Sequence, residues 1–383
     1  MDTAALKASW AQAATLGDEV PSYFYAHLFF THPELRPMFP LRMSGQRDKL
    51  VAALGAVVSN VDQLDEVIPL LEQLGRDHRR FRAVTEHYTA VGASLLATLK
   101  HFFGPAWTPE LHQTWSEAYG LVAKVMVTAA EQDQDRTPAV WEAEVVRVER
   151  RSVEVAVFEV LPKEQYSYRA GQSVAVKIPQ RPREWRYYSP ANAPESSGRI
   201  EFHVQPIDGG LVSAPLVHQL RPGDVVQLAA PVGDRLTLPE DGPLPDLLMV
   251  AGGTGLAPLR AVLQQIDQQF AGKGPAPLVH LFHGSRMPWN LYDHEYLQDL
   301  QRRAPWFDYT PVVSEDRTYP GAIGLVGDVA AEAGDWSQRV AMVCGSRWMV
   351  EHTTQTLEAA GLPAASIRRE QFDFHATPPR EAR

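Results

Sequence analysis

Residues 247–259 read Leu-Leu-Met-Val-Ala-Gly-Gly-Thr-Gly-Leu-Ala-Pro-Leu, an apolar run that leads into a glycine-rich turn. The apolar part predicts a buried β-strand, and the glycines let the backbone approach a phosphate at the positive end of a following helix. Pro258 stands where dinucleotide-binding motifs have a third glycine, and it suits a first helical turn. Taken alone, the pattern also fits an ordinary strand-to-helix turn.

Strands and helices continue to alternate toward the C-terminus. The sequence predicts helices over 258–270 and 291–301 and strands over 278–282 and 340–343. This order is typical of a parallel sheet covered by helices, so an α/β domain is expected over 246–375. The acidic residue that would bind a ribose about twenty residues after the turn is missing. Ser285 and Arg286 follow the second strand instead, which leaves NADH and NADPH as alternatives.

Upstream of the turn, the hydrophobic pattern has a period of two. Alternation is present over residues 144–148, 152–157, 173–178 and 200–204, with turn residues between the runs. Several short alternating strands separated by turns are typical of an antiparallel β-barrel, which we expect over 138–242. A stretch rich in proline and glycine, 238–245, ends this region.

The first 134 residues have a helical pattern, with apolar residues three and four positions apart. Four prolines, at positions 33, 37, 40 and 105, fall where such helices would end. A polar run over 132–138 has no periodicity and predicts a linker. The sequence therefore predicts a multidomain chain: an all-α domain over 1–134, the β-barrel and the α/β domain.

Composition excludes several classes of function. The formal charge is −10, from 36 Lys and Arg against 46 Asp and Glu, and no basic stripe would neutralise phosphates, so we expect no nucleic-acid partner. No segment is apolar enough to span a membrane, and no export signal is visible, which predicts a cytoplasmic protein. No obligatory protein partner is evident. The single cysteine, Cys344, excludes an iron–sulfur cluster held by several thiolates.

A second motif, Arg186-Tyr-Tyr-Ser189, lies in the barrel region. Its arginine can pair with a pyrophosphate and an aromatic ring can stack on an isoalloxazine, although a surface strand with a solvated arginine would look the same. Together with segments 209–213, 253–258 and 344–346, the motif resembles the ferredoxin–NADP reductase family in order and spacing.

This resemblance implies FAD and a nicotinamide nucleotide as cofactors. Arg186 matches the residue that contacts the FAD pyrophosphate, Tyr188 the residue that stacks on the flavin and Ser189 the residue near its reactive nitrogen. The residues that match the segment capping the flavin phosphates are Gly210, Val212 and Ser213. The residues that match the segments placing the nicotinamide are Gly253, Thr254, Gly255, Pro258, Cys344, Gly345 and Ser346. A flavin takes a hydride and passes electrons singly, so a one-electron acceptor is expected elsewhere.

His78 is the candidate metal ligand of the N-terminal region. It shares an apolar helix face with Leu71, Leu74 and Phe81, although such a histidine also fits a core position. The N-terminal region resembles the bacterial flavohaemoglobins, in which a globin precedes this kind of reductase. The segments that carry the resemblance are 24–29, 33–35, 38–39, 46–47, His78, 88–92, 95–99 and 115–120.

The flavohaemoglobin resemblance implies haem b as the acceptor. His78 then matches the proximal iron ligand, and Phe39 the aromatic residue against the porphyrin. Tyr25 matches the distal tyrosine that hydrogen-bonds dioxygen, with Gln46 and Leu50 in the same pocket, on a helix that Ser44 is expected to cap. The remaining matches are Tyr88 beside the proximal histidine and Phe372, the C-terminal aromatic residue near the flavin.

Two positions depart from the family. An ungapped count puts Ala130 where the family has a glutamate that tunes the proximal histidine through a tyrosine, with Glu131 one place beyond. Asp77 stands where the family has a lysine that pairs with a C-terminal glutamate, matched here by Glu370. Two acids would repel, and Arg368 or Arg369 is expected to compensate.

The resemblance implies a nitric oxide dioxygenase, which converts NO and O2 to nitrate with electrons passed from NAD(P)H through FAD to haem. One alternative is an NAD(P)H-dependent flavohaem reductase or oxidase that acts on O2, peroxides or an organic substrate, motivated by Ala130 and Asp77. Another is a haem gas-binding module that its reductase keeps ferrous.

Overall fold

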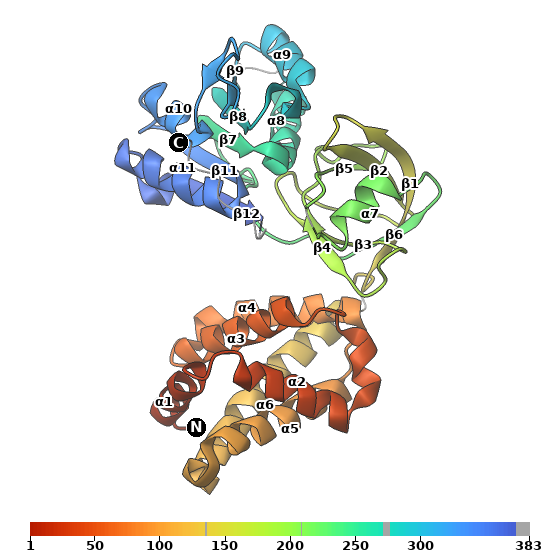
Figure 1. The fold of residues 1–383 in the computed structure, drawn as a ribbon, viewed down its shortest axis with the longest axis vertical. Helices are drawn as coiled ribbons and strands as arrows, with labels where there is room; N and C mark the ends of the chain where they lie inside the picture. The colour runs from red at the N-terminus through yellow and green to blue at the C-terminus, as the bar shows by residue number, and fades with distance from the viewer. Residues whose placement is uncertain (135, 208, 271–275, 373–383) are drawn as a thin grey trace. The chain divides into compact units, whose positions relative to one another are not determined.

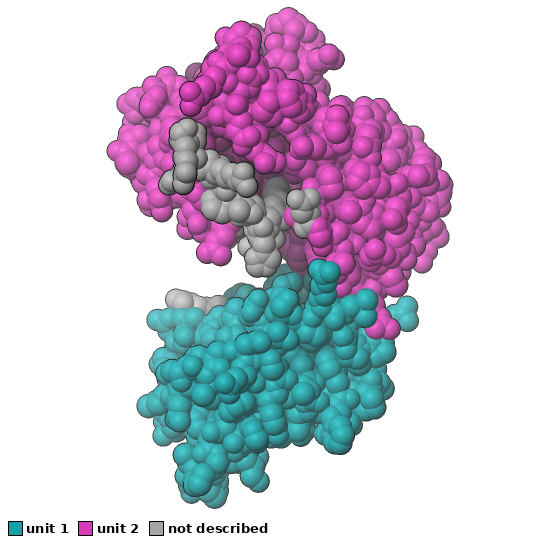
Figure 2. Space-filling model, in the orientation of Figure 1, with its two compact units in different colours: residues 1–140 teal, residues 141–383 magenta. Residues whose placement is uncertain are grey.

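The computed structural model describes residues 1–134, 136–207, 209–270 and 276–372, except for the side chains of Leu64, Glu66, Gln371 and Phe372. The chain forms two compact units, Met1–Val140 and Trp141–Arg383, called here the N-terminal and the C-terminal unit (Figure 2). Each unit has its own core. None of the helices in the described ranges is both long enough and apolar enough to cross a membrane.

The N-terminal unit is all α-helical (Figure 1). Its elements are α1 (Thr3–Ala14), α2 (Glu19–Thr31), η1 (Pro33–Met38), α3 (Ser44–Ser59), α4 (Leu64–His78), η2 (Arg79–Phe81), α5 (Thr85–Phe103), η3 (Gly104–Ala106) and α6 (Pro109–Gln134). Asp2 caps α1 by accepting a hydrogen bond from the Ala5 N–H at 3.0 Å. The prediction that Ser44 caps α3 was wrong. This helix begins at Ser44 itself, and the residue at the cap position is Met43, which makes no side-chain hydrogen bond there.

Two hydrophobic clusters hold these helices together. The larger one joins α1, α2, α5 and α6 around Leu28, Leu99 and Trp115, all almost fully buried. The smaller one joins α4 to α6 through Val67, Leu71 and Met126. The backbones of α4 and α6 approach closely at Gly75, where a Cβ atom would lie 2.2 Å from Met126 O. Glycine is therefore required for this crossing.

The C-terminal unit begins with an antiparallel sheet that forms a barrel (Figure 1). Its elements are β1 (Trp141–Arg150), β2 (Ala156–Pro162), β3 (Val174–Lys177), β4 (Trp185–Tyr188), β5 (Ile200–Val204), α7 (Ser213–His218) and β6 (Val225–Leu228), with strand order β4-β3-β6-β1-β2-β5. A bridge between Pro190 and Phe202 joins the two ends of this order.

One predicted strand of the barrel was too long. Alternation from Ser152 predicts a strand through Val157, but Arg151 and Ser152 both donate backbone hydrogen bonds to Val155 O. These bonds close a turn, and β2 begins only at Ala156. A polar turn on one face of a hairpin has the same alternation as a half-buried strand, so the pattern did not distinguish them.

The second half of the C-terminal unit is a parallel sheet with helices on both faces. Its elements are β7 (Leu247–Gly252), η4 (Gly253–Gly255), α8 (Leu256–Phe270), β8 (Val279–Ser285), η5 (Pro288–Asn290), α9 (His294–Arg303), β9 (Phe307–Val313), β10 (Ala322–Ile323), α10 (Val326–Glu332), β11 (Val340–Ser346), α11 (Arg347–Ala359), η6 (Ala364–Ser366) and β12 (Ile367–Phe372).

Side chains of β7 alternate between two cores. Met249 and Ala251 pack with α8 and α9, while Leu248 and Val250 pack with α10 and α11. The strand order is β10-β9-β8-β7-β11-β12, so β8, β9 and β10 are added on one side of β7 and β11 and β12 on the other. The order in which the chain adds strands therefore reverses between β7 and β11. In such sheets, ligands bind outside the carboxyl ends of the strands at this reversal. The predicted fold class, all-α then antiparallel barrel then parallel α/β, is confirmed.

The close crossing at Gly75 gives the first prediction. Gly75→Ala lowers the stability of the N-terminal unit by roughly 3 kcal/mol, because the added methyl group forces α4 away from α6. Gly120→Ala is the control, since Gly120 lies in α6 with nothing within 4 Å of the new Cβ. This change leaves the stability of the N-terminal unit unchanged or raises it by up to about 1 kcal/mol. Calorimetry of the full chain measures both. If the Gly75→Ala variant unfolds at the same temperature as the wild-type protein, this close contact is contradicted.

Candidate functional site

A tyrosine and a glutamine form a polar pair inside the apolar core of the N-terminal unit. Gln46 Nε2 donates to Tyr25 Oη at 3.2 Å, and Tyr25 Oη donates to the backbone oxygen of Gln46 at 3.4 Å. Tyr25 comes from α2 and Gln46 from the first turn of α3, so the α2–α3 packing sets the pair. Burial raises the pKa of Tyr25 to about 12, although the Gln46 hydrogen bond lowers it somewhat. The hydroxyl therefore keeps its proton and can donate it to a ligand.

Aromatic rings surround this pair. The ring of Tyr25 lies 5.6 Å from that of Phe39 and 5.8 Å from that of Phe29, and Leu50 packs against the same cluster. The predicted residues Tyr25, Phe39, Gln46 and Leu50 are therefore brought together by the structure. An apolar cluster with one hydrogen-bond donor suits a small polar ligand on a haem iron.

His78 ends α4 in a buried environment. Its Nδ1 lies 2.7 Å from Leu74 O, and because a carbonyl oxygen accepts, Nδ1 carries the proton. Burial lowers the pKa of His78, while the Leu74 hydrogen bond and the charge of Asp77 raise it. The imidazole is thus neutral, with a lone pair on Nε2. This is the form in which histidine ligates a metal.

Tyr88 lies beside His78, with 6.3 Å between the ring centroids. Its hydroxyl is buried and has no hydrogen-bond partner among the described residues. Ala130 offers no acceptor, and the side chain of Glu131 is exposed on α6. A neutral histidine with its Nε2 lone pair unused, beside an aromatic ring, fits the proximal side of a haem site.

Asp77 and Glu370 each have a neutral partner within their own unit. Gln73 Nε2 donates to Asp77 Oδ1 at 3.1 Å, and burial raises the pKa of Asp77. Burial also raises the pKa of Glu370, while a hydrogen bond from Ser173 and the charge of Arg235 lower it. Arg368 instead donates to Thr237 O at 3.1 Å. The charge that lowers the pKa of Glu370 is that of Arg235, which the sequence did not indicate.

The flavin motif occupies the edge strand β4. Arg186 is half exposed, and its Nη1 donates to Glu184 Oε2 at 3.0 Å and to Trp185 O at 2.8 Å. Glu184 is buried, so it fixes the guanidinium while leaving its other N–H groups to an anion. Tyr188 is partly buried against the barrel core, and burial raises its pKa.

Ser189 begins a chain of hydroxyl contacts. Its Oγ lies 3.2 Å from Ser173 Oγ, and Ser173 donates to the Glu370 carboxylate of β12. Sequence analysis identified Ser189 but missed Ser173, which stands just before β3 and belongs to no motif. Phe372, two residues after Glu370, ends β12, and its side chain lies outside the described part of the chain.

The segment matched to the flavin phosphates leads into α7. Val212 is buried in the barrel core, and Ser213 is the first residue of the helix. Ser213 Oγ accepts from the Ile207 N–H at 3.1 Å, which folds the loop back onto the helix start. A Cβ atom at Gly210 would lie 2.4 Å from Ser213 Oγ. Gly210, Val212 and Ser213 therefore share one tight turn.

Two turns meet at the carboxyl ends of β7 and β11. A Cβ atom at Gly255 would lie 2.2 Å from Cys344 O, and one at Gly345 would lie 2.5 Å from Met349 Cε. Thr254 lies between the glycines of η4, Pro258 is buried in the first turn of α8, and Ser346 caps α11. Burial, with the charge of Glu370, raises the pKa of Cys344 well above its usual value, so the thiol is protonated.

A fully buried histidine supports the first of these turns. His283 Nε2 donates to Gly253 O at 3.1 Å, and burial lowers its pKa to about 4, which keeps it neutral. A polar residue inside an apolar strand is the one feature of the sequence that points to this role. Ser285, at the end of β8, donates to Met287 O. The small residues at the two turns leave backbone N–H groups accessible, as a nucleotide phosphate requires.

Comparison with known families and structures agrees with this architecture. The globin family model matches residues 22–126, the oxidoreductase FAD-binding domain 142–235 and the oxidoreductase NAD-binding domain 249–355. A crystal structure of flavohemoglobin from Malassezia yamatoensis with bound FAD and heme is 17% identical, with a TM-score of 0.78 over 97% of this chain and 98% of that one. The fold and site thus define an NAD(P)H-dependent oxidoreductase with haem and FAD as cofactors.

Curated relatives identify the family. The flavohemoprotein of Bacillus subtilis is 26% identical over 93% of this chain and 92% of its own length. The flavohemoprotein of Bordetella parapertussis is 30% identical over 67% of this chain and 68% of its own length. The chain belongs to the flavohaemoprotein family.

The orphaned hydroxyl gives the second prediction. Tyr88→Phe leaves the free energy of unfolding unchanged or raises it by up to about 1 kcal/mol, since the hydroxyl has no partner to lose. Tyr119→Phe is the matched control: Tyr119 Oη donates to Tyr88 O at 2.6 Å, so its loss costs about 1 kcal/mol. Thermal unfolding at matched haem content compares the variants. Destabilisation by Tyr88→Phe as large as that by Tyr119→Phe would contradict the assignment.

Proposed function

We propose that this flavohaemoprotein is a nitric oxide dioxygenase that converts NO and O2 to nitrate at the expense of NADH or NADPH. The observation that carries the proposal is the Tyr25–Gln46 pair, in which the buried Tyr25 keeps its hydroxyl protonated among apolar side chains. O2, NO and the nucleotide are its proposed small-molecule partners, and the cytoplasm is its proposed location. The family's domain order supports a complete electron path within one chain.

Haem supplies the iron at which O2 and NO react, and FAD converts the hydride of NAD(P)H into single electrons. On the distal side, the Tyr25 hydroxyl would exchange its long hydrogen bond to Gln46 O for one to dioxygen, while Gln46 Nε2 donates to the Tyr25 oxygen. The rings of Phe29 and Phe39 surround the Tyr25 ring with apolar surface. A donor in such low-dielectric surroundings stabilises a polar oxygen ligand more strongly than it would in water.

On the proximal side, Leu74 O holds His78 with Nε2 free as the iron ligand. On the reductase side, Arg186 holds the FAD pyrophosphate, Tyr188 packs on the flavin ring and Ser189 donates near its reactive nitrogen. The turns at Gly255 and Cys344 place the nicotinamide. These roles agree with the positions of the residues on an edge strand and at the strand reversal.

A second candidate function is a flavohaem reductase whose acceptor is O2, a peroxide or an organic substrate. The observation in its favour is the unpartnered Tyr88 hydroxyl, since a proximal histidine bonded only to a carbonyl lacks the anionic partner found where O–O bonds are cleaved, as formation of nitrate from NO and O2 requires. NADH-driven reduction of O2, which leaves the O–O bond intact, faster than NO consumption would favour it.

NO consumption tests the proposal. In air with NADH or NADPH, haem-replete protein converts NO to nitrate, and Tyr25→Phe speeds O2 dissociation by about tenfold, the effect of one lost hydrogen bond near 1.4 kcal/mol. Tyr23→Phe is the matched control, because Tyr23 lies on the same helix but stacks on His101 at 4.2 Å. Absence of nucleotide-dependent nitrate formation would reject the proposal.

Absorption spectra test the two cofactor sites separately. His78→Ala removes the haem Soret band, because it removes the Nε2 lone pair proposed to bind the iron, and leaves the flavin bands and their bleaching by NAD(P)H intact. The independence follows from the division of the chain into two units with separate cores. A Soret band of normal intensity and position in His78→Ala would show that another residue ligates the iron.

A further inference from the structure

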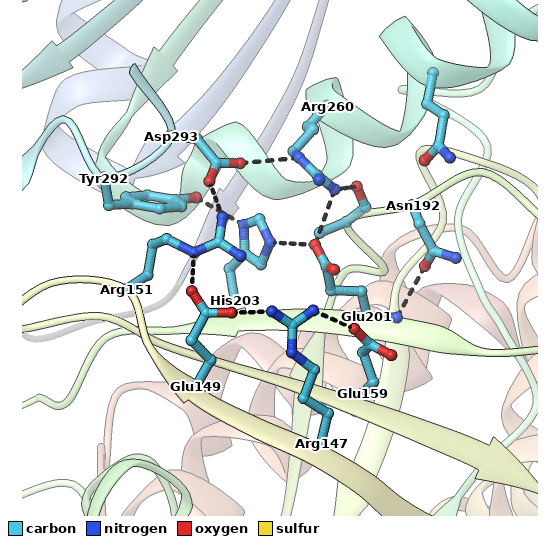
Figure 3. Close-up of polar contacts among 12 residues, drawn as sticks. Arg147, Glu149, Arg151, Glu159, Asn192, Glu201, His203, Arg260, Tyr292 and Asp293 are labelled. Atoms are coloured by element: carbon cyan, nitrogen blue, oxygen red, sulfur yellow. Dashed lines mark hydrogen bonds and ion pairs between the residues drawn. The ribbon is translucent and has the colours of Figure 1, made fainter. Parts of the chain in front are cut away.

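A buried cluster of charges joins the barrel to the α/β half of the C-terminal unit (Figure 3). Its members from the barrel are Glu149, Arg151, Glu201 and His203, and its members from the α/β half are Arg260, Tyr292 and Asp293. We propose that Arg260, at the centre of this cluster, is a positioning residue that sets the flavin motif against the nicotinamide turn for hydride transfer.

Arg260 lies one turn into α8, the helix that opens from the Gly253–Gly255 turn. Its Nη1 donates to Ala191 O at 2.7 Å and lies 2.9 Å from Glu201 Oε1, and its Nε lies 2.8 Å from Asp293 Oδ2. Ala191 follows Ser189 of the flavin motif by two residues. One guanidinium therefore connects the chain that leaves the flavin motif to the helix that leaves the nucleotide turn.

A second contact from the same helix repeats this connection. Gln264, one turn after Arg260, accepts a hydrogen bond from the Ala193 N–H at 3.0 Å. Ala193 is buried in the hydrophobic core that also contains Leu256 and Leu259 of α8. Successive turns of α8 thus hold Ala191 and Ala193 by their backbones, whatever the side chains there.

The acids of the cluster keep Arg260 in one orientation. Asp293 is almost fully buried, and its two oxygens are shared between Arg260 and Arg151. Burial raises the pKa of Glu201, but the hydrogen bond from His203 and the charges of Arg260 and Arg151 lower it to about 2. His203 Nδ1 lies 3.0 Å from Tyr292 Oη, which adds another link between the halves. Each charge in the cluster has an opposite partner, so no buried charge is left unpaired.

The connection matters because hydride transfer requires the reacting atoms about 3–3.5 Å apart, and a misplacement of 1 Å can cost about a hundredfold in rate. The flavin and nicotinamide motifs belong to different halves of the unit, so their separation depends on contacts between the halves. Arg260 and Gln264 make such contacts within two turns of the nucleotide motif. We therefore assign them an effect on the transfer step and not on nucleotide affinity.

The experiment uses the full haem- and FAD-loaded chain, mixed anaerobically with saturating NADH or NADPH in a stopped-flow instrument. Arg260→Gln is expected to slow flavin reduction by at least about tenfold, with weaker nicotinamide–flavin charge-transfer absorbance and little change in nucleotide Kd. Amide hydrogen exchange rises over residues 190–193. Gln264→Ala shifts the same quantities in the same direction by a smaller factor.

Two further variants separate positioning from charge balance. Arg260→Lys keeps the charge, but its single ammonium cannot hold Ala191 O, Glu201 and Asp293 together, so the rate recovers only in part. Arg303→Gln is the matched control, because Arg303 on α9 pairs with Asp267 on α8 within the α/β half, and its flavin reduction stays at the wild-type rate.

Wild-type reduction rate and charge-transfer absorbance in FAD-loaded Arg260→Gln would overturn the proposal, as would full recovery in Arg260→Lys. If Arg260→Gln does not fold, Gln264→Ala decides, because it removes a connection without leaving a buried charge: an unchanged rate and unchanged exchange over 190–193 overturn the proposal. Since flavin reduction precedes any reaction with NO, the result is independent of the nitric oxide dioxygenase proposal.

Discussion

The reductase half of this protein depends on one close approach of backbone to backbone. The carbonyl oxygen of Cys344 occupies the space that a side chain at residue 255 would need, 2.2 Å from the position of its Cβ atom. Because β7 and β11 are adjacent parallel strands, their following turns must share this space. Only a glycine in the first turn permits it, and the same lack of a side chain exposes the backbone to a nucleotide. Sheet order and binding site thus follow from one steric constraint.

The same half also contains charges that a hydrophobic core would normally exclude. Burying Asp293, Glu201 and Arg260 costs several kcal/mol per ion before their mutual attraction is counted, so such a cluster adds little net stability compared with apolar residues. The cluster instead contributes to orientation. Ion pairs and hydrogen bonds fix how the two halves of the unit are oriented, whereas apolar contacts allow them to slide. The two halves must hold two cofactors against each other. A defined orientation between the halves is therefore a reason to retain buried charge.

How much of this could be predicted from the sequence differs between fold and site. The three kinds of domain followed from changes in hydrophobic period, and the turn at Gly253–Gly255 from its glycines, because these signals are local. The network around Arg260 was not predicted, since its members lie between positions 149 and 293 and share no motif. Glu184, Ser173 and His283 were missed for the same reason. The cap at Ser44 failed because Met43 already has a helical backbone, which no composition rule indicates.

The two sides of the proposed haem site differ in how their polar groups are satisfied. On the distal side, Tyr25 and Gln46 each donate a hydrogen bond to the other, so both polar groups have a partner. On the proximal side, His78 donates to the neutral carbonyl of Leu74, and the Tyr88 hydroxyl has no partner in the described chain. A carbonyl increases the basicity of an imidazole less than a carboxylate does, so His78 donates less electron density to a metal. Less donation favours the reduced metal, which is the state that a flavin reductase must supply and that binds dioxygen.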